Sequence, residues 1–249
     1  MFNYMYADLR RIYRRLPRLI VLTLIYIAVT AVLASALGDG EIKAAPMMIL
    51  FEHYAVGYFP LVIGLVEMAS LYSDDFRAKT MQQAIGMGIS RTEVVLCKLL
   101  DMTVLLLIDL AVFGAVTLAA GGIWGGAGMT AEVTGELLLT LLSAWLKAVA
   151  YASLSMTLAF YTQNALFSML VYIALASGAA NTMLGMALGM RSLAPLHLPR
   201  FLLTSQANAF YTHALLGYFD LASFLAVLIY IAAGAFASSW LFKNVELEL

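Results

Sequence analysis

Asp109 and Lys147 are charged residues inside long apolar stretches, where they could pair, line a transport path or relay protons. A charge at the centre of a bilayer costs about 2.5–3.5 kcal/mol on insertion scales. If both stretches cross a membrane, helical rise places both residues roughly 16 Å below the outer surface. A direct Asp109–Lys147 ion pair is therefore favoured over a polar patch in a transport cavity. A proton relay lacks the spare carboxylates that such relays usually contain.

Glu67 and Asn181 also lie in apolar stretches. Glu67 could snorkel to the cytosolic surface, cap a neighbouring helix or face an inward cavity, and we expect a structural role. Asn181 lies beside Ser177, Gly178 and Thr182, which are small enough to let helices approach closely. Helix packing is therefore favoured over substrate contact for Asn181.

The other reactive residues form no catalytic or metal-binding motif. The three histidines are widely separated and have no partner one helical turn away. Met183, Met186 and Met190 lack the Cys or His of a soft-metal path, so packing against lipid or in an adaptable apolar cavity is favoured. The sequence contains neither the Gly-x-Ser-Gly of an intramembrane serine protease nor a phosphate-binding loop. We therefore expect no catalytic, metal or cofactor site in this chain.

Membrane helices must position these residues. Hydrophobic residues make up 63% of the 249 residues, compared with about 45–50% in soluble domains. The single cysteine, Cys97, excludes an intrachain disulfide. We predict one all-α polytopic membrane domain over residues 1–249, because six stretches approach the roughly 20 apolar residues that a span needs: 19–37, 55–73, 100–120, 136–161, 164–188 and 219–242.

The distribution of Lys and Arg predicts the orientation of these spans, because cytosolic loops carry an excess of both. Most of the 14 Lys and Arg residues fall on one side, whereas Lys43, Arg191 and Arg200 fall on the other. We therefore expect a multi-pass protein of the cell membrane with both termini in the cytosol. The outer segment 189–218 is too apolar for a free loop and should form a hairpin of short helices at the outer interface.

Residues 1–18 have the pattern of an amphipathic helix lying in the membrane plane. Arg11, Arg14, Arg15 and Arg18 share one helical face, and apolar side chains share the other. This helix either only fixes the topology or is an elbow that also contacts a cytosolic partner.

Residues 74–98, between the second and third spans, form the most polar segment of the chain. Asp74 and Asp75 suit a helix N-terminus, and the run Gly86-Met87-Gly88 should end that helix. Ser90 and Glu93 have capping-box spacing. The segment is therefore predicted to be a helix, a sharp glycine turn and a second helix across the cytosolic face.

This segment resembles the loop between spans two and three of type-2 ABC exporter permeases. Gly88, Ser90 and Arg91 match the family's Gly-x-Ser-Arg turn, and Lys98 matches the end of its second helix. Asp75, Arg77 and Thr80 match the opening of the loop, although the triplet before Thr80 lacks the family's glycine. The ending 240–246 and the amphipathic start resemble the family as well, so the likeness covers the whole architecture.

The resemblance implies a permease subunit that is not itself an enzyme. It would pair with a second permease, identical or related, and with two cytosolic ABC ATPase subunits that bind ATP and Mg. Its ATPase-coupling residues would be Asp75, Arg77, Thr80, Ile85, Gly88, Ser90 and Arg91. We expect Ile85→Asp and Arg91→Glu to release or uncouple the ATPase.

The apolar composition of the spans favours export of an amphipathic or hydrophobic substrate, such as a peptide, a lipid-like molecule or a drug, and no nucleic acid is expected as a partner. The alternative is an ATP-independent secondary transporter. That class typically shows inverted repeats and broken helices, and neither is evident in the sequence.

Overall fold

The computed structural model describes residues 2–13, 20–21, 23–28, 53–77, 80–124, 130–190, 196–215 and 219–245. The described residues form helices and turns and contain no strand, which confirms the all-α prediction for this part of the chain. The helices are α1 (Phe2–Tyr13), η1 (His53–Ile63), α4 (Gly64–Arg77), α5 (Thr80–Gly86), α6 (Arg91–Trp124), α7 (Ala131–Thr162), α8 (Ala165–Ala176), α9 (Ala179–Leu188), η4 (Leu198–Phe201), α10 (Leu203–Leu215) and α11 (Leu221–Lys243).

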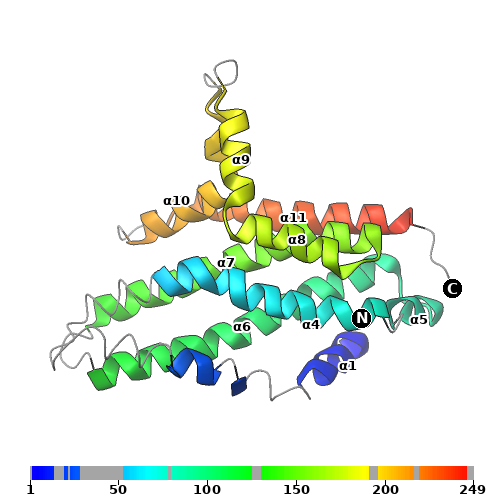
Figure 1. The fold of residues 1–249 in the computed structure, drawn as a ribbon, viewed down its shortest axis with the longest axis horizontal. Helices are drawn as coiled ribbons and strands as arrows, with labels where there is room; N and C mark the ends of the chain where they lie inside the picture. Colours follow the sequence, from blue (N-terminus) through cyan, green and yellow to red (C-terminus); the bar gives the residue numbers. More distant parts are fainter. Residues whose placement is uncertain are drawn as a thin grey trace.

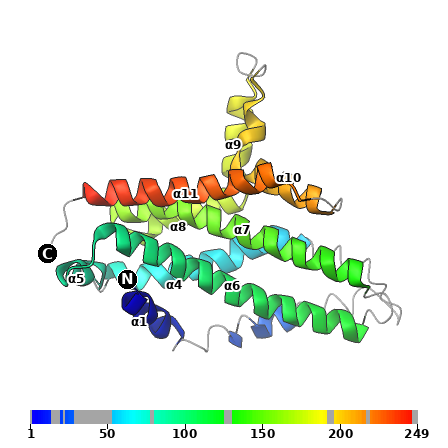
Figure 2. The ribbon, with the colours of Figure 1, turned by 180° about the vertical axis from the view of Figure 1, so that it is seen from behind.

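Helix α7 lies at the centre of a bundle in which α4, α6, α8 and α11 run alongside one another (Figures 1 and 2). It contacts α6, α8, α10 and α11, and small side chains on α7 bring these neighbours close. A Cβ atom on Gly234 of α11 would lie 2.6 Å from the backbone of Ser153. Such close approach through small residues is how membrane helices associate when lipid is as apolar as their own side chains.

Three described helices are long and apolar enough to cross a membrane, namely Arg91–Ala119, Thr134–Thr162 and Leu221–Lys243. They overlap the predicted third, fourth and sixth spans, and the first of them begins nine residues earlier than predicted. The predicted second span is a helix over 53–77 with a shorter apolar part, Tyr58–Ser73. Most of the predicted first span, 19–37, lies outside the described residues.

The predicted fifth span, 164–188, is not one straight helix. Helices α8 and α9 meet at an angle of 67°, and α9 projects away from the bundle (Figures 1 and 2). The break falls at Ser177 and Gly178, where Gly178 has a left-handed φ of 79° that a residue with a side chain rarely adopts. If the bent pair counts as one span, the described helices supply four spans.

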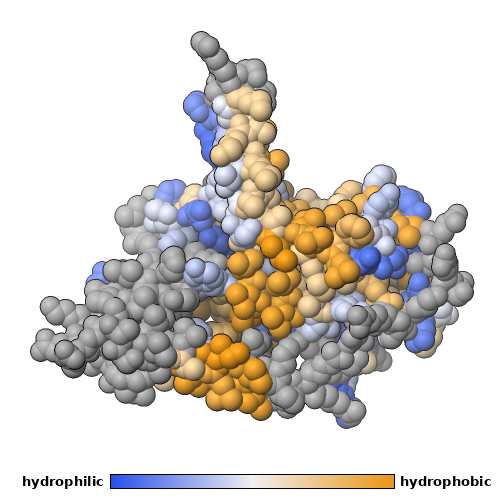
Figure 3. Space-filling view, viewed as in Figure 1, coloured by the Kyte–Doolittle hydropathy of each residue, from blue (hydrophilic) through white to orange (hydrophobic). Residues whose placement is uncertain are grey.

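The surface of α8 is strongly hydrophobic, as Figure 3 shows. Leu166, Phe167 and Leu170 are between 54% and 66% exposed. Apolar patches of this kind on a long helical bundle fit contact with lipid, and they agree with a membrane protein.

Helix α1, helix α5 and the end of α11 gather at one end of the bundle (Figure 1). The end of α6, the start of α7 and the start of α11 lie toward the opposite end. The first of these ends is the one that the Lys and Arg distribution predicts to be cytosolic, and it carries the predicted coupling segment. From the predicted outer hairpin, η4 and α10 are described, and both are helical.

Candidate coupling surface and buried polar groups

Helix α5 is the short helix predicted between the second and third spans. Met81 and Ala84 are buried beneath it, whereas Gln83 faces outward. Met87, in the turn that follows, is 78% exposed. An exposed methionine at the tip of a short, well-anchored helix is a suitable contact for another protein, because its flexible thioether adapts to the partner's surface.

The glycine turn after α5 is a Schellman motif. The Ile89 amide donates to the Ala84 carbonyl at 3.2 Å, and the Gly88 amide donates to the Ile85 carbonyl at 2.9 Å. Gly88 has a φ of 94°, and a Cβ atom there would touch nothing within 4 Å. Glycine is therefore required at position 88 for its backbone conformation and not for lack of space.

The capping box predicted at the start of α6 is confirmed. The Ser90 amide donates to Glu93 Oε2 at 3.0 Å, and the Glu93 amide donates to Ser90 Oγ at 3.2 Å. These reciprocal bonds satisfy two amides that the helix start would otherwise leave unpaired. They fix the direction in which α6 leaves the turn.

Arg91 has a structural role that the sequence did not reveal. Its Nη1 donates to the carbonyls of Phe242, Lys243 and Val245 at 2.7, 3.0 and 2.7 Å. Its guanidinium also lies 5.5 Å from the centre of the Phe242 ring. Arg91 thus binds the unpaired carbonyls at the end of α11, where a cation is favoured. This contact ties the coupling segment to the last helix.

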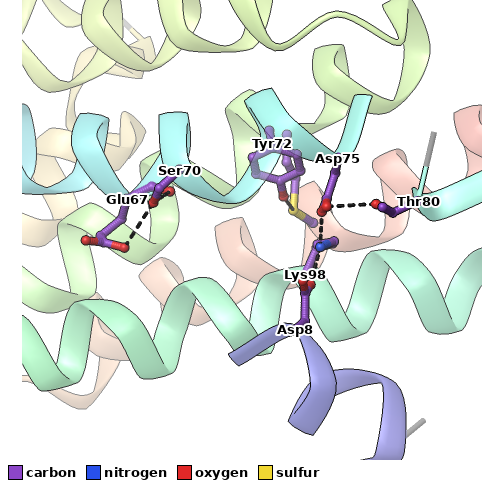
Figure 4. Close-up of polar contacts among 8 residues, drawn as sticks. Asp8, Glu67, Ser70, Tyr72, Asp75, Thr80 and Lys98 are labelled. Carbon is purple, nitrogen blue, oxygen red and sulfur yellow. Dashed lines mark hydrogen bonds and ion pairs between the residues drawn. The ribbon is translucent and has the colours of Figure 1, made fainter. Parts of the chain in front are cut away.

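Asp75 lies inside the molecule, not on the predicted coupling surface, and Thr80 beside it is half-buried. Asp75 is 1% exposed, and it accepts a hydrogen bond from Thr80 Oγ1 at 2.8 Å. Its other oxygen is ion-paired with Lys98 of α6, which also pairs with Asp8 of α1 (Figure 4). Asp75, which was predicted to contact a partner, therefore helps to join α1, α4 and α6 through Lys98. A buried carboxylate requires a paired cation, and Lys98 supplies it.

Two further predicted coupling residues are Ile85 and Arg77. Ile85 is only half-buried and packs against the hydrophobic core, so it anchors α5 instead of facing a partner. Arg77 ends α4, and its side chain lies outside the described residues. Of the seven predicted residues, Gly88 and Ser90 shape the turn. Met87, which comes directly before Gly88 and was not among the seven, is 78% exposed.

The fastening around Lys98 also changes the chemistry of Tyr4 on α1. The Lys98 ammonium lies 5.6 Å from the centre of the Tyr4 ring. Burial raises the pKa of the Tyr4 hydroxyl to about 12, and the positive charge of Lys98 only partly opposes this effect. Tyr4 therefore stays neutral, and it shields one side of the buried ion pairs.

Glu67 is fully buried, so it does not snorkel to the surface. It lies on α4, and Ser70 Oγ, one turn later, is 3.4 Å from its Oε2 (Figure 4). This position among packed helices agrees with the expected structural role.

The predicted Asp109–Lys147 ion pair is absent from the described structure. Lys147 donates to Asn208 Oδ1 of α10 at 2.6 Å, and its ammonium is not among the described ion pairs. Both residues are nearly buried, at 3% and 5% exposed. Equal depth in antiparallel helices was therefore not enough for pairing, because Lys147 is directed to α10.

Asn181 lies on the projecting helix α9, in which no residue is buried. The small residues around it form the bend between α8 and α9, and do not create a close helix crossing. The predicted packing role is therefore not seen within the described chain.

A polar group at the opposite end of the bundle was also missed by sequence. Asp220 caps α11 by accepting hydrogen bonds from the Ala222 and Ser223 amides, and its Oδ2 lies 2.7 Å from both Ser223 Oγ and His213 Nδ1. The hydrogen bond from Ser223, followed by that from His213, lowers the Asp220 pKa to about 2. An Asp before an apolar helix is a recognisable cap signal, but the His213 partner required the turn between α10 and α11.

Among the described residues, no group of three His, Cys, Asp or Glu side chains could hold a metal ion. The chain matches no protein-family model and no curated protein.

Proposed function

We propose that this chain is the membrane-spanning permease subunit of an ATP-driven ABC exporter. It would pair with a second permease, identical or related, and dock on two separate cytosolic ATPase subunits. The observation that carries the proposal is the construction of α5 and its turn. A short helix with an exposed tip is held at fixed angles between two helices of the bundle.

A force applied at Met87 would be transmitted to the bundle, because the turn that contains Met87 is held in place. Met87 lies inside the Schellman motif, and the capping box directly after it fixes the start of α6. Asp75 and Lys98 join α4 to α6, and Arg91 joins α6 to the end of α11. A push on the tip would therefore reach three long helices as one displacement, as coupling between a motor and a transport path requires.

The substrate proposed is amphipathic or hydrophobic. The described helices expose apolar side chains over much of their length, and the intramembrane polar groups Asp109 and Lys147 are few and buried. An extended polar path for a strongly charged substrate would need more such groups.

The test is ATP hydrolysis by the chain co-purified with candidate ABC ATPase subunits. Met87→Asp should abolish co-purification or remove the effect of the chain on hydrolysis, while leaving thermal stability unchanged because the side chain is exposed. Met87→Leu and Met183→Ala are the controls, since the first keeps an apolar tip and the second alters an exposed methionine on α9. Unchanged binding and hydrolysis in Met87→Asp would reject the coupling role.

The alternative, an ATP-independent secondary transporter, is favoured by one observation. The break between α8 and α9 resembles the interrupted helices typical of such transporters. If no ATPase subunit binds, and vesicles containing the chain alone move a hydrophobic fluorescent dye when a proton gradient is imposed, the alternative replaces the exporter proposal.

A further inference from the structure

Asp101 is a buried carboxyl group without a compensating hydrogen bond. It lies on α6, one turn after Lys98, and it is 0% exposed. No described group donates a hydrogen bond to either of its carboxyl oxygens. Its strongest charge interaction is with the like-charged Asp8 of α1, ahead of its interaction with Lys98.

The groups that face this cluster come from three helices. Helix α1 contributes Tyr4 and Asp8, α4 contributes Tyr72 and Asp75, and α6 contributes Cys97 and Lys98 beside Asp101 itself. The Lys98 ammonium is already engaged by Asp8 and Asp75. Tyr72 donates its hydroxyl proton to the Met156 sulfur at 3.6 Å, so this proton is not given to Asp101.

The other helices packed against α6 bring no compensating charge. Helix α5, over Thr80–Gly86, has no ionisable side chain, and the only charged residue of α11 is the exposed Lys243. On α7 the charged residues are Glu132, Glu136 and Lys147, and Lys147 is engaged by Asn208 of α10. Within the described residues, three carboxyl groups therefore share one ammonium.

We propose that Asp8 and Asp101 form a proton-binding site that holds one proton between their carboxyl groups, and that this proton keeps α1 packed on α4 and α6. An ionised carboxylate that is buried, lacks hydrogen bonds and lies beside another carboxylate is much less stable than its protonated form. When it is protonated, Asp101 can donate a hydrogen bond. Asp8, the charged group that acts most strongly on Asp101, would accept it. The ligand of this site is thus a proton, which a buried carboxyl pair of this kind binds readily.

Loss of the proton to solvent would leave two adjacent carboxylates with one shared cation. Their repulsion would act between α1 and α6, and it would loosen α1 from the bundle. This inference does not rest on the proposed transport function, because it concerns only how α1 is fastened.

Infrared spectroscopy of the full chain in detergent tests the site directly, because a protonated carboxyl group has its own carbonyl band. At neutral pH the wild type should show a protonated carboxyl band that Asp101→Asn removes. Asp109→Asn is the matched control, since Asp109 is also a buried carboxyl on the same helix, at 3% exposed. A spectrum that is unchanged by Asp101→Asn, whatever Asp109→Asn does, overturns the proposal.

Amide hydrogen exchange of the segment Phe2–Tyr13 tests the consequence. Wild type and Asp101→Asn are compared at the same pH, so that the intrinsic pH dependence of exchange cancels. On moving from neutral to alkaline pH, the wild type should lose protection in α1 by at least several-fold relative to Asp101→Asn, which has no proton to lose. Equal protection of the two proteins at every pH would contradict the role of the proton in fastening α1.

Discussion

Two buried lysines occupy neighbouring helices of the bundle, and their hydrogen-bond partners differ in charge. Lys98 on α6 is fully buried and pairs with two carboxylates from other helices. Lys147 on α7 is 5% exposed and has a neutral amide as its partner. A buried charge is tolerated when it is paired and hydrogen-bonded, and it is costly when it is not. The comparison therefore distinguishes a buried lysine that carboxylates balance from one whose described hydrogen-bond partner is neutral.

The same contrast distinguishes the end of the bundle around Lys98 from the middle of α7. Around Lys98, contacts between residues far apart in sequence join α1, α4 and α6, and Arg91 extends them to α11. Near the middle of α7, Lys147 donates a hydrogen bond to Asn208 of α10, which belongs to the predicted outer hairpin. The end that carries α5 is therefore built as a rigid unit, whereas Lys147 has a single neutral partner that it can exchange at lower cost.

The largest effect is expected from Lys98→Met. The substitution leaves Asp8 and Asp75 buried without their cation, which costs about 3–5 kcal/mol in stability. Thermal unfolding in detergent, with the yield of folded protein as a second readout, measures the loss. Lys98→Arg is the control, because it keeps the charge in the site. A Lys98→Met protein as stable as the wild type would show that the carboxylates have another partner. Lys98 would then not be the cation that balances them.

Thr80→Val should have a smaller effect at the same cluster. The variant keeps the shape of the side chain but removes the hydrogen bond from the Thr80 hydroxyl to Asp75. Hydrogen bonds to charged groups contribute about 1.5–3 kcal/mol, and the half-buried position of Thr80 favours the lower end of that range. Denaturant unfolding of Thr80→Val and Thr80→Ser distinguishes the hydrogen bond from packing, since serine restores only the hydroxyl.

Lys147→Met should leave stability unchanged or raise it slightly, although Lys147 is almost as buried as Lys98. Removing a cation that no described carboxylate balances also removes its desolvation cost, which offsets the hydrogen bond lost by Asn208. Transport activity, however, should fall at least tenfold if Lys147 lines the path. Unfolding as severe as that of Lys98→Met would mean that Lys147 is also a structural fastening.

The two lysines also show where reasoning from sequence succeeded and where it failed. Local patterns were read correctly, because Ser90, Glu93 and Gly88 act within their own turn and their spacing contains the geometry. The ion pairs were not predicted correctly, because they depend on the rotation of each helix about its axis. Asp109 and Lys147 have matching depth but do not pair, whereas Asp8 and Lys98 pair across 90 residues of sequence. Hydrophobic periodicity in helices that are apolar on all sides does not indicate which face meets which neighbour.

The bend between α8 and α9 was also not predicted from the sequence. Ser177 and Gly178 were read as small packing residues, and their apolar flanks gave no sign of a break. Gly is tolerated in membrane helices as well as at helix ends. Its backbone conformation, and not its size, decided the outcome at position 178.

The smallest effect is expected at Asp220, whose side chain is half-buried, unlike the carboxyl groups of the buried clusters. Its pKa is lowered to about 2 in the folded chain by hydrogen bonds from Ser223 and His213, compared with about 3.9 when unfolded. The folded state therefore binds the proton more weakly, so Asp220 contributes stability above pH 4 and loses it as the pH falls towards 2. Unfolding measured across this range should show a smaller acid loss in Asp220→Asn than in the wild type. An acid loss that is equal in both would show that the cap is not formed in solution. Because Asp220 is half-buried, whereas the Asp75 carboxylate that Thr80 binds is fully buried, the change should remain well below that of Thr80→Val. This order would support burial as the property that separates the polar clusters of the chain.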